Sequence, residues 1–255
     1  MKFAVRRPIK IVMLGAGGTG AYIARDLYRL LYALDRPCRF IIADGDLCEE
    51  KNLIRQNFTP ADLGQNKAQV VATRYSSVFG LETEYIPEFI EYEDRLMELV
   101  RTELFPDPNY TYSWGDKKVK ELVILIGAVD NNKSRQLCHN VFLECQDLVY
   151  IDAGNGVLNG QVVCGVRRAG RTMAQPVGTL YPDILEAKDK FPTELSCAEA
   201  SVSAPQSIMA NIMAASSVLC VLYNIMTSGE NIIRKATFST KSGFVRTEVE
   251  QVKAA

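Results

Sequence analysis

Short apolar segments alternate with longer amphipathic ones over the first 150 residues. Continuous apolar runs that end at glycine or a polar residue are typical of buried strands in a parallel sheet. Such runs occur at 9–14, 39–44, 122–127 and 148–153, with a shorter one at 84–89. Apolar residues at helical spacing predict helices over 18–34, 67–78, 92–104 and 133–146. The alternation predicts a doubly wound, Rossmann-like α/β fold with a mostly parallel sheet covered on both faces.

The pattern changes in the second half of the chain. Residues 160–168 alternate between polar and apolar side chains, which predicts an antiparallel strand. Residues 169–197 show no periodicity and contain several Pro, Gly and Thr, so we expect a long crossover loop there. The segments 236–240 and 244–248 predict antiparallel C-terminal strands joined by a turn. With a loop expected at 106–120 and no clean linker, the whole chain, 1–255, is expected to be a single domain.

Residues 200–229 contain no charged side chain. A stretch of this length raises the question of a membrane span. It also contains a proline and several Ser, Asn and Gln residues, which would be costly in lipid. We therefore expect a helix over 203–228 that is buried in the fold or in a dimer interface, and no membrane association.

Composition narrows the class of protein further. The 255 residues are 47% hydrophobic and 23% charged, with 29 Lys and Arg against 30 Asp and Glu, which is ordinary for a globular protein and excludes a disordered chain. Because Lys and Arg are not in excess, the composition gives no indication of nucleic acid or an anionic membrane as a partner. The first ten residues do not resemble a signal peptide. The seven cysteines include no C-x-x-C pair, so we expect reduced thiols in a cytoplasmic protein, with neither a disulfide framework nor a four-cysteine zinc site.

The first expected strand ends in Gly15-Ala16-Gly17-Gly18-Thr19-Gly20, directly before the first expected helix. Glycines in this pattern suit a tight turn, a close approach of backbone N–H groups to phosphate, and close packing of helix on strand. Asp44 ends the second strand, where a carboxylate accepts hydrogen bonds from a ribose. The combination predicts a nucleotide site. It leaves an NAD-dependent dehydrogenase and an ATP-using enzyme level.

Three charged residues separate these two interpretations. Arg55 offers a planar fork to phosphate oxygens, Lys67 offers a point charge, and Asp130, just beyond a buried strand, can hold Mg²⁺ against phosphates. A dehydrogenase has no use for the two cations, because the glycine turn already satisfies its pyrophosphate. Taken singly, the cations are equally well explained as surface charges and the acid as a helix cap. Together they favour a triphosphate.

These residues belong to longer motifs: G-A-G-G-T-G, D-G-D-x5-N-L-I-R-Q-x-F, D-L-G-x2-K and V-D-N-x3-R. In this order and spacing they resemble the ATP-binding core of the ubiquitin-activating enzyme superfamily. Its prokaryotic branch includes the adenylyltransferases for the sulfur carriers of thiamine and molybdopterin synthesis. Ile151-Asp152-Ala153-Gly154 and Ser196-Cys197-Ala198-Glu199-Ala200 extend the resemblance, which covers about residues 9–228.

The resemblance implies an ATP-dependent adenylyltransferase that uses ATP and Mg²⁺ and forms a homodimer. Its partner would be a ubiquitin-like or sulfur-carrier protein with a C-terminal Gly-Gly tail, activated as an acyl adenylate with release of pyrophosphate. The implied catalytic residues are Arg55, Lys67, Asp130 and Cys197, with Asp130 as the metal ligand. The implied nucleotide-binding residues are Gly15, Gly17, Gly18, Gly20, Asp44, Asp46, Asn52, Arg55, Gln56, Lys67, Asp130 and Asn131.

Cys197 matches a position where some relatives carry a cysteine that accepts the carrier as a thioester or persulfide, whereas other relatives only adenylate. Its expected place at a loop end and a helix start favours access and a lowered thiol pKa. We expect the only histidine, His139, to be structural, because it lies in the middle of a helix. Four other cysteines fall in apolar stretches and are expected in the core: Cys138, Cys145, Cys164 and Cys220.

Two features depart from the family pattern. Many relatives carry C-x-x-C pairs for zinc, and this chain has none, so we predict no zinc. Many also carry an N-terminal helix that supplies an arginine to the partner subunit, for which Arg6 and Arg7 are poor matches. Three alternatives stay open: a member that activates a carboxylate on tRNA, against which the balanced charge weighs, a non-catalytic scaffold, and an NAD-dependent oxidoreductase.

Overall fold

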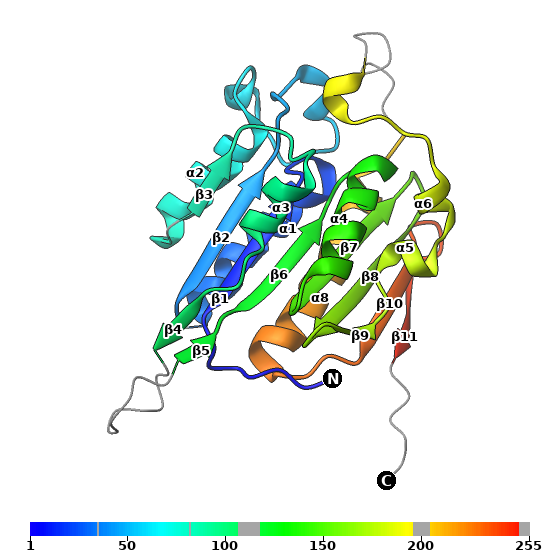
Figure 1. The fold of residues 1–255 in the computed structure, drawn as a ribbon. Helices are drawn as coiled ribbons and strands as arrows, with labels where there is room; N and C mark the ends of the chain where they lie inside the picture. Colours follow the sequence, from blue (N-terminus) through cyan, green and yellow to red (C-terminus); the bar gives the residue numbers. More distant parts are fainter. Residues whose placement is uncertain (35, 82, 107–117, 196–204, 250–255) are drawn as a thin grey trace.

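The computed structural model describes residues 1–34, 36–81, 83–106, 118–195 and 205–249 (Figure 1). Its centre is a nine-stranded sheet with the strand order β11-β10-β8-β7-β6-β1-β2-β3, in which β9 pairs with β8 off this path. The strands are β1 (Ile9–Leu14), β2 (Cys38–Ala43), β3 (Thr83–Ile86), β6 (Leu122–Gly127), β7 (Leu148–Asn155), β8 (Asn159–Arg168), β9 (Arg171–Ala174), β10 (Ile233–Ser239) and β11 (Phe244–Val249). The predicted α/β class with antiparallel C-terminal strands is confirmed.

Five neighbouring strands of the sheet run parallel to one another: β3, β2, β1, β6 and β7. From β7 onwards the neighbouring pairs β7–β8, β8–β10 and β10–β11 are antiparallel. β1 lies in the middle of the parallel half, where Ile11 pairs with Phe40 of β2 and with Ile124 of β6. Every residue of β1 and β6 is buried, as continuous apolar runs predict for strands covered on both faces. Lys10 is the one charged residue in these two strands, and its Nζ lies 2.9 Å from the buried carboxylate of Glu121.

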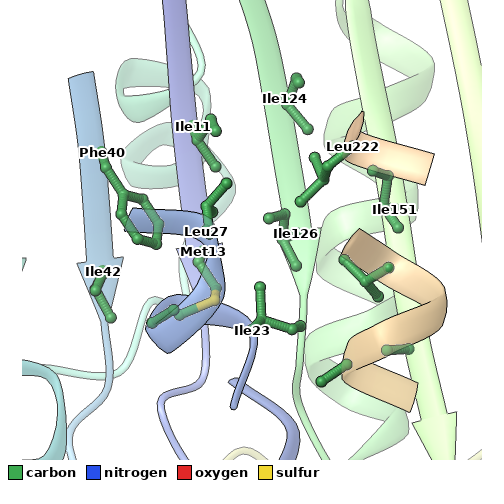
Figure 2. Close-up of a cluster of buried hydrophobic side chains, with 14 of the residues drawn as sticks. Ile11, Met13, Ile23, Leu27, Phe40, Ile42, Ile124, Ile126, Ile151 and Leu222 are labelled. Atoms are coloured by element: carbon green, nitrogen blue, oxygen red, sulfur yellow. The ribbon is translucent and has the colours of Figure 1, made fainter. Parts of the chain in front are cut away.

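Helices cover both faces of the sheet. On one face lie α1 (Gly18–Ala33), α2 (Lys67–Phe79) and α8 (Ile208–Tyr223), and on the other lie α3 (Glu93–Leu99), α4 (Asn132–Glu144), α5 (Val177–Leu180) and α6 (Asp183–Glu186). Because strand side chains alternate, Ile11 and Met13 enter the first core, and Val12 and Leu14 enter the second. Figure 2 shows the first core, with Leu27 of α1 and Leu222 of α8 among the strand residues. The two cores fix the sheet between two helical layers.

The segment around the loop expected at 106–120 is more regular than the sequence indicates. α3 ends at Leu99, five residues before the expected end, and short strands β4 (Leu104–Pro106) and β5 (Lys118–Lys120) pair antiparallel. Polar contacts draw the chain away from the helical path: Lys10 Nζ donates to Arg101 O at 2.6 Å, and Glu103 N donates to Glu121 Oε1 at 2.9 Å. Contacts with neighbouring segments therefore end the helix earlier than the sequence pattern predicts.

The segment 169–197, expected as a crossover loop, contains β9, α5, α6 and a 3-10 turn at Pro192–Glu194 in its described part. Gln136 of α4 anchors this segment, because its Nε2 donates to Ile184 O at 2.9 Å and to Ala187 O at 2.8 Å. Val177 and Ile184 are buried in the second core. Elements of a single turn are too short to produce a periodic pattern in the sequence.

The charge-free segment forms α8, followed by a π-helical turn over Asn224–Ser228. By length and composition alone, Ile208–Ser228 could cross a membrane, but half of its most apolar window is buried against the fold. α8 packs on α1, β7 and β8, as expected of a core helix. Cys138, Cys145 and Cys164 are buried, as predicted, but the prediction for Cys220 is wrong, because it lies on the exposed face of α8.

Candidate functional site

The carboxyl ends of β2, β1, β6 and β7 open into one cavity of about 870 Å³. Ligands of open α/β sheets bind at this edge, and the volume lies within the roughly 300–1,000 Å³ usual for small-molecule sites. Most of the residues expected to bind nucleotide line it: Gly15, Gly17, Gly18, Asp44, Asp46, Asn52, Arg55, Gln56, Lys67, Asp130 and Asn131. The fold thus brings together residues that are far apart in sequence.

The glycine turn joins β1 to α1, and each glycine has its own reason to lack a side chain. Gly15 has φ +94°, and a Cβ there would lie 2.5 Å from Ala128 O. A Cβ at Gly20 would lie 2.0 Å from Gly15 O, so this residue is needed for packing and does not line the cavity. Gly17 faces the cavity, and the nearest atom to a Cβ there belongs to Gln56 at 3.7 Å. The turn therefore presents bare backbone to the cavity at the N-terminus of α1.

Asp44 closes the end of β2 and ties it to the glycine turn. Its Oδ2 accepts from Ala16 N at 2.6 Å, and its Oδ1 accepts from Asp46 N at 2.9 Å. Burial raises the pKa of Asp44 to about 6, against the opposing effect of Lys67. The carboxylate is thus held rigidly at the cavity wall by two backbone donors.

Lys67 begins α2 and lies at the floor of the cavity. Its Nζ lies 2.7 Å from Asp46 Oδ2, and its side chain is 7% exposed. Burial opposes the charge, but Asp44 and Asp46 together raise the pKa of Lys67 above its ordinary value. Asn66, which caps α2 through Gln69 N, donates to Asp44 O at 2.7 Å and so fixes the start of the helix beside Asp44.

The segment between Asp46 and α2 carries Asn52, Arg55 and Gln56. Asn52 Oδ1 accepts from Glu49 N at 2.9 Å, so one end of this amide stabilises its own 3-10 turn, Glu50–Asn52. Arg55 reaches across the glycine turn, because a Cβ at Gly18 would lie 2.8 Å from Arg55 Nη1. Gln56 is buried, and its Oε1 has no partner within the described part of the chain. An unpaired buried polar atom beside the turn fits a polar ligand.

Asp130 is exposed in the loop between β6 and α4, close enough to Lys67 and Arg135 to affect both electrostatically. The neighbouring Asn131 is the N-cap of α4, where its Oδ1 accepts from Ser134 N at 2.7 Å. One acceptor site of its amide oxygen is thus used within the helix. Arg135 supports the loop, because its Nη2 donates to Val129 O at 2.6 Å.

The family model that describes the ThiF family matches residues 5–254, nearly the whole chain. The chain belongs to the ThiF family. The family expected from the glycine turn and the N-L-I-R-Q block is thereby confirmed. No protein with curated annotation is similar enough in sequence to this chain to match it.

Solved structures with the same fold include selenomethionine-labelled PaaA, with a TM-score of 0.61 at 19% identity over 94% of this chain and 63% of that chain. Escherichia coli MccB with ATP gives a TM-score of 0.58 at 16% identity over 95% and 64%. MccB with AMPCPP and MccA gives 0.60 at 15% identity over 96% and 65%. The ThiF family chain thus spans less than two thirds of these neighbours, and identities this low show the fold alone.

Several contacts in and beside the cavity of this ThiF family protein were not expected from the sequence. Arg135 forms a buried ion pair with Asp152, 3.3 Å from Nε to Oδ1, and Tyr150 Oη donates to Asp152 Oδ2 at 2.8 Å. Gln206, which directly precedes the N-cap of α8, accepts from Arg55 Nη1 at 2.7 Å. Arg135 and Asp152 lie within motifs that the sequence shows, whereas nothing near Gln206 in the sequence indicates a site.

Some predicted positions lie away from the cavity or outside the described residues. Cys197 belongs to 196–204, which the structure does not describe. Arg7 donates to the carbonyls of Lys120 and Glu121 at the opposite edge of the sheet. His139 is buried on α4, where a Cβ at Gly178 would lie 2.7 Å from its Nδ1, and burial lowers its pKa. The structure thus agrees with a structural role for His139.

Proposed function

We propose that this ThiF family protein is an ATP-dependent adenylyltransferase that activates a carboxylate of a peptide or protein. The observation that carries the proposal is that Asp44, the glycine turn, two cations and Asp130 line one and the same cavity. A dinucleotide site needs only the first two. The additional charges suit the three phosphates of ATP.

ATP would lie along the carboxyl edge of the sheet. Its ribose would bind Asp44, and its phosphates would lie over the N-terminus of α1, between Arg55 and Lys67. The donor set also fits Mg²⁺: the described residues contain no group of three metal-binding side chains, but Mg²⁺ on a nucleotide commonly takes one or two protein carboxylates together with phosphate oxygens. Asp130 would hold it there, and the bound ion would neutralise charge on the phosphates.

The chemistry asks little of the protein beyond placement and charge. ATP supplies the adenylyl group: an oxygen of the substrate carboxylate bonds to the α-phosphorus, the bond to the bridging oxygen breaks, and pyrophosphate leaves. The carboxylate is already deprotonated at neutral pH, so no general base is needed. Arg55 and Lys67 would stabilise the charge that builds on the phosphates. A cavity without a free histidine is consistent with this reaction.

For the substrate we propose the C-terminal carboxylate of a ubiquitin-like or sulfur-carrier protein, whose flexible tail, typically ending in Gly-Gly, would enter the cavity. The cavity wall also includes residues of the β7–β8 region and of the 177–195 segment, among them Asn155, Gln161 and Lys190. In the sheet, β1 and β6 separate β7 from β2, the strand that Asp44 follows. Amides and a cation suit a peptide backbone and its terminal carboxylate. Among the structural neighbours, MccB has been crystallised with the peptide MccA.

The test is pyrophosphate–ATP exchange, measured on the full chain with a synthetic peptide ending in a free Gly-Gly carboxylate and with the same peptide as its C-terminal amide. The proposal predicts exchange that requires Mg²⁺ and the free carboxylate. Exchange that persists with the amide would contradict a carboxylate substrate. Failure with the peptide but exchange with a folded carrier protein would show that the carrier's folded domain is needed.

We further propose that Cys197 accepts the activated carrier as a thioester. The thiolate would attack the acyl carbon, and AMP would leave, which balances the step without any oxidant. Cys197→Ser should retain pyrophosphate exchange and lose any carrier adduct that dithiothreitol removes. If wild type forms no such adduct under conditions of full exchange, Cys197 has no covalent role.

We also propose that the protein is cytoplasmic and acts as a homodimer through the outer face of α8. Met209 and Tyr223 are each 52% exposed on this helix, and Cys220 and Ser216 lie between them. Helical spacing places these residues along one stripe. Tyr223→Lys should convert a dimer to a monomer in analytical ultracentrifugation, and a wild-type chain that sediments as a monomer would contradict this arrangement.

A further inference from the structure

Arg55, which the proposed function places at the phosphates, is held by a neutral acceptor. Its Nη1 donates to Gln206 Oε1 at 2.7 Å, and both side chains line the cavity. Within the described residues, Arg55 forms no ion pair. The guanidinium is therefore oriented by an uncharged amide. A carboxylate at residue 206 would hold the same donor but cancel the charge that phosphate binding needs.

Gln206 itself stands on a well-anchored helix start. Ser207 is the N-cap of α8: its Oγ accepts from Ala210 N at 3.2 Å and donates to Val157 O at 2.6 Å. Asn211, which is fully buried, joins this helix start to the glycine turn. Its Nδ2 donates to Gln206 Oε1 at 3.1 Å, the oxygen that also accepts from Arg55, and to Thr19 Oγ1 at 3.5 Å. The backbone that carries Gln206 is thereby fixed relative to the N-terminus of α1.

The glycine turn is shaped to admit this arrangement. A Cβ at Gly18 would lie 1.9 Å from the Asn211 side-chain amide and 2.8 Å from Arg55 Nη1. Only glycine lets both groups approach the first turn of α1, where a phosphate would bind. Arg55 thus lies directly beside the expected phosphates, and its position depends on a residue 151 positions later in the chain.

We propose that Gln206 is a positioning residue, which holds the Arg55 guanidinium over the N-terminus of α1 so that its remaining donors face the phosphates of ATP. This inference rests on the proposed function. A long side chain that is oriented before the ligand arrives loses less conformational entropy on binding. The benefit is confined to ligands whose phosphates reach Arg55.

The experiment uses Gln206→Met, which keeps the length of the side chain and removes the acceptor, with Arg55→Ala and the double variant. Gln146→Met is the control, because Gln146 is exposed and does not line the cavity. Affinity for Mg·ATP and for AMP is measured by calorimetry on the full chain. Loss of a hydrogen bond to a charged group predicts about tenfold weaker Mg·ATP binding for Gln206→Met and unchanged AMP binding. In the Arg55→Ala background, Gln206→Met should have no further effect. Gln146→Met should leave Mg·ATP affinity unchanged.

Each contrary result has a separate meaning. Equal losses for ATP and AMP, or additive losses in the double variant, would show a merely structural Gln206 and overturn the inference. Unchanged Mg·ATP binding by Gln206→Met would overturn it as well. Wild type that fails to bind Mg·ATP would instead overturn the proposed function on which the inference rests.

Discussion

Lys67 Nζ lies 2.7 Å from Asp46 Oδ2 at the floor of a cavity in which Asp44 is also buried. Burial, the largest single effect, acts against a charge on Lys67, and the two carboxylates outweigh it and raise its pKa. A buried ammonium is costly unless it is paired. The arrangement keeps a permanent positive charge where the glycine turn presents its backbone donors.

Lys67→Met should weaken Mg·ATP binding by at least about tenfold, because a methionine keeps the volume and removes the charge that the phosphates would meet. Calorimetry with Lys188→Met as the control checks this, since Lys188 is exposed and does not line the cavity. Equal affinities for the two variants would exclude Lys67 from the nucleotide site.

Asp44→Asn should change how stability depends on pH. The native carboxyl keeps its proton up to about pH 6, whereas the unfolded chain loses it at the ordinary, lower pKa of aspartate. The folded state therefore binds more protons in between, and the free energy of unfolding falls as pH rises through roughly 4 to 6. The whole contribution is on the order of 2–3 kcal/mol.

Denaturant unfolding of wild type and Asp44→Asn between pH 4 and pH 8 measures this effect. Wild type should lose stability relative to the variant across that window and show no further relative change above it. A stability difference that stays constant with pH would contradict a buried carboxyl with a raised pKa.

Two glycine substitutions should separate folding from binding. A Cβ at Gly20 would meet Gly15 O at 2.0 Å, so Gly20→Ala should destabilise the protein by about 1–3 kcal/mol. A Cβ at Gly17 meets its nearest neighbour only at 3.7 Å, so Gly17→Ala should fold normally but weaken Mg·ATP binding, because the methyl group faces the phosphates. Thermal melts and calorimetry together decide this. A Gly17→Ala variant with normal ATP affinity would show that the phosphates do not bind at the turn.

Asp130→Asn should abolish Mg²⁺-dependent exchange with little effect on stability, within about 0.5 kcal/mol, because Asp130 is exposed. Glu144→Gln, an exposed acid at the other end of α4, is the matched control. Exchange by Asp130→Asn at the wild-type rate would remove this carboxylate from the proposed mechanism.

The sheet and the glycine turn were predictable because their signals are local. Ile9–Leu14 and Leu122–Gly127 are buried on both faces and therefore apolar throughout, and the turn between β1 and α1 must contain glycine at Gly15 and Gly20 for steric reasons. The strand β10 near the C-terminus also follows from local alternation, since Phe238 is buried and Thr237 is not.

Other features depend on contacts between distant segments, and a single sequence does not show them. α3 ends early because Lys10 of β1 donates to Arg101 O, just beyond the helix. α6 is anchored by Gln136 of α4, which donates to Ile184 O and Ala187 O. Gln206 reaches Arg55 only through the packing of α8 against α1. In each case the deciding partner is a tertiary one, which overrides or replaces the local pattern.

The central claim is that this cavity binds Mg·ATP in order to transfer its adenylyl group, and titration calorimetry of the full chain with Mg·ATP and with NAD tests it most directly. The account predicts saturable binding of Mg·ATP, which Lys67→Met weakens at least about tenfold, and no comparable binding of NAD. Saturable binding of NAD without binding of Mg·ATP would contradict it and favour the alternative of an NAD-dependent oxidoreductase.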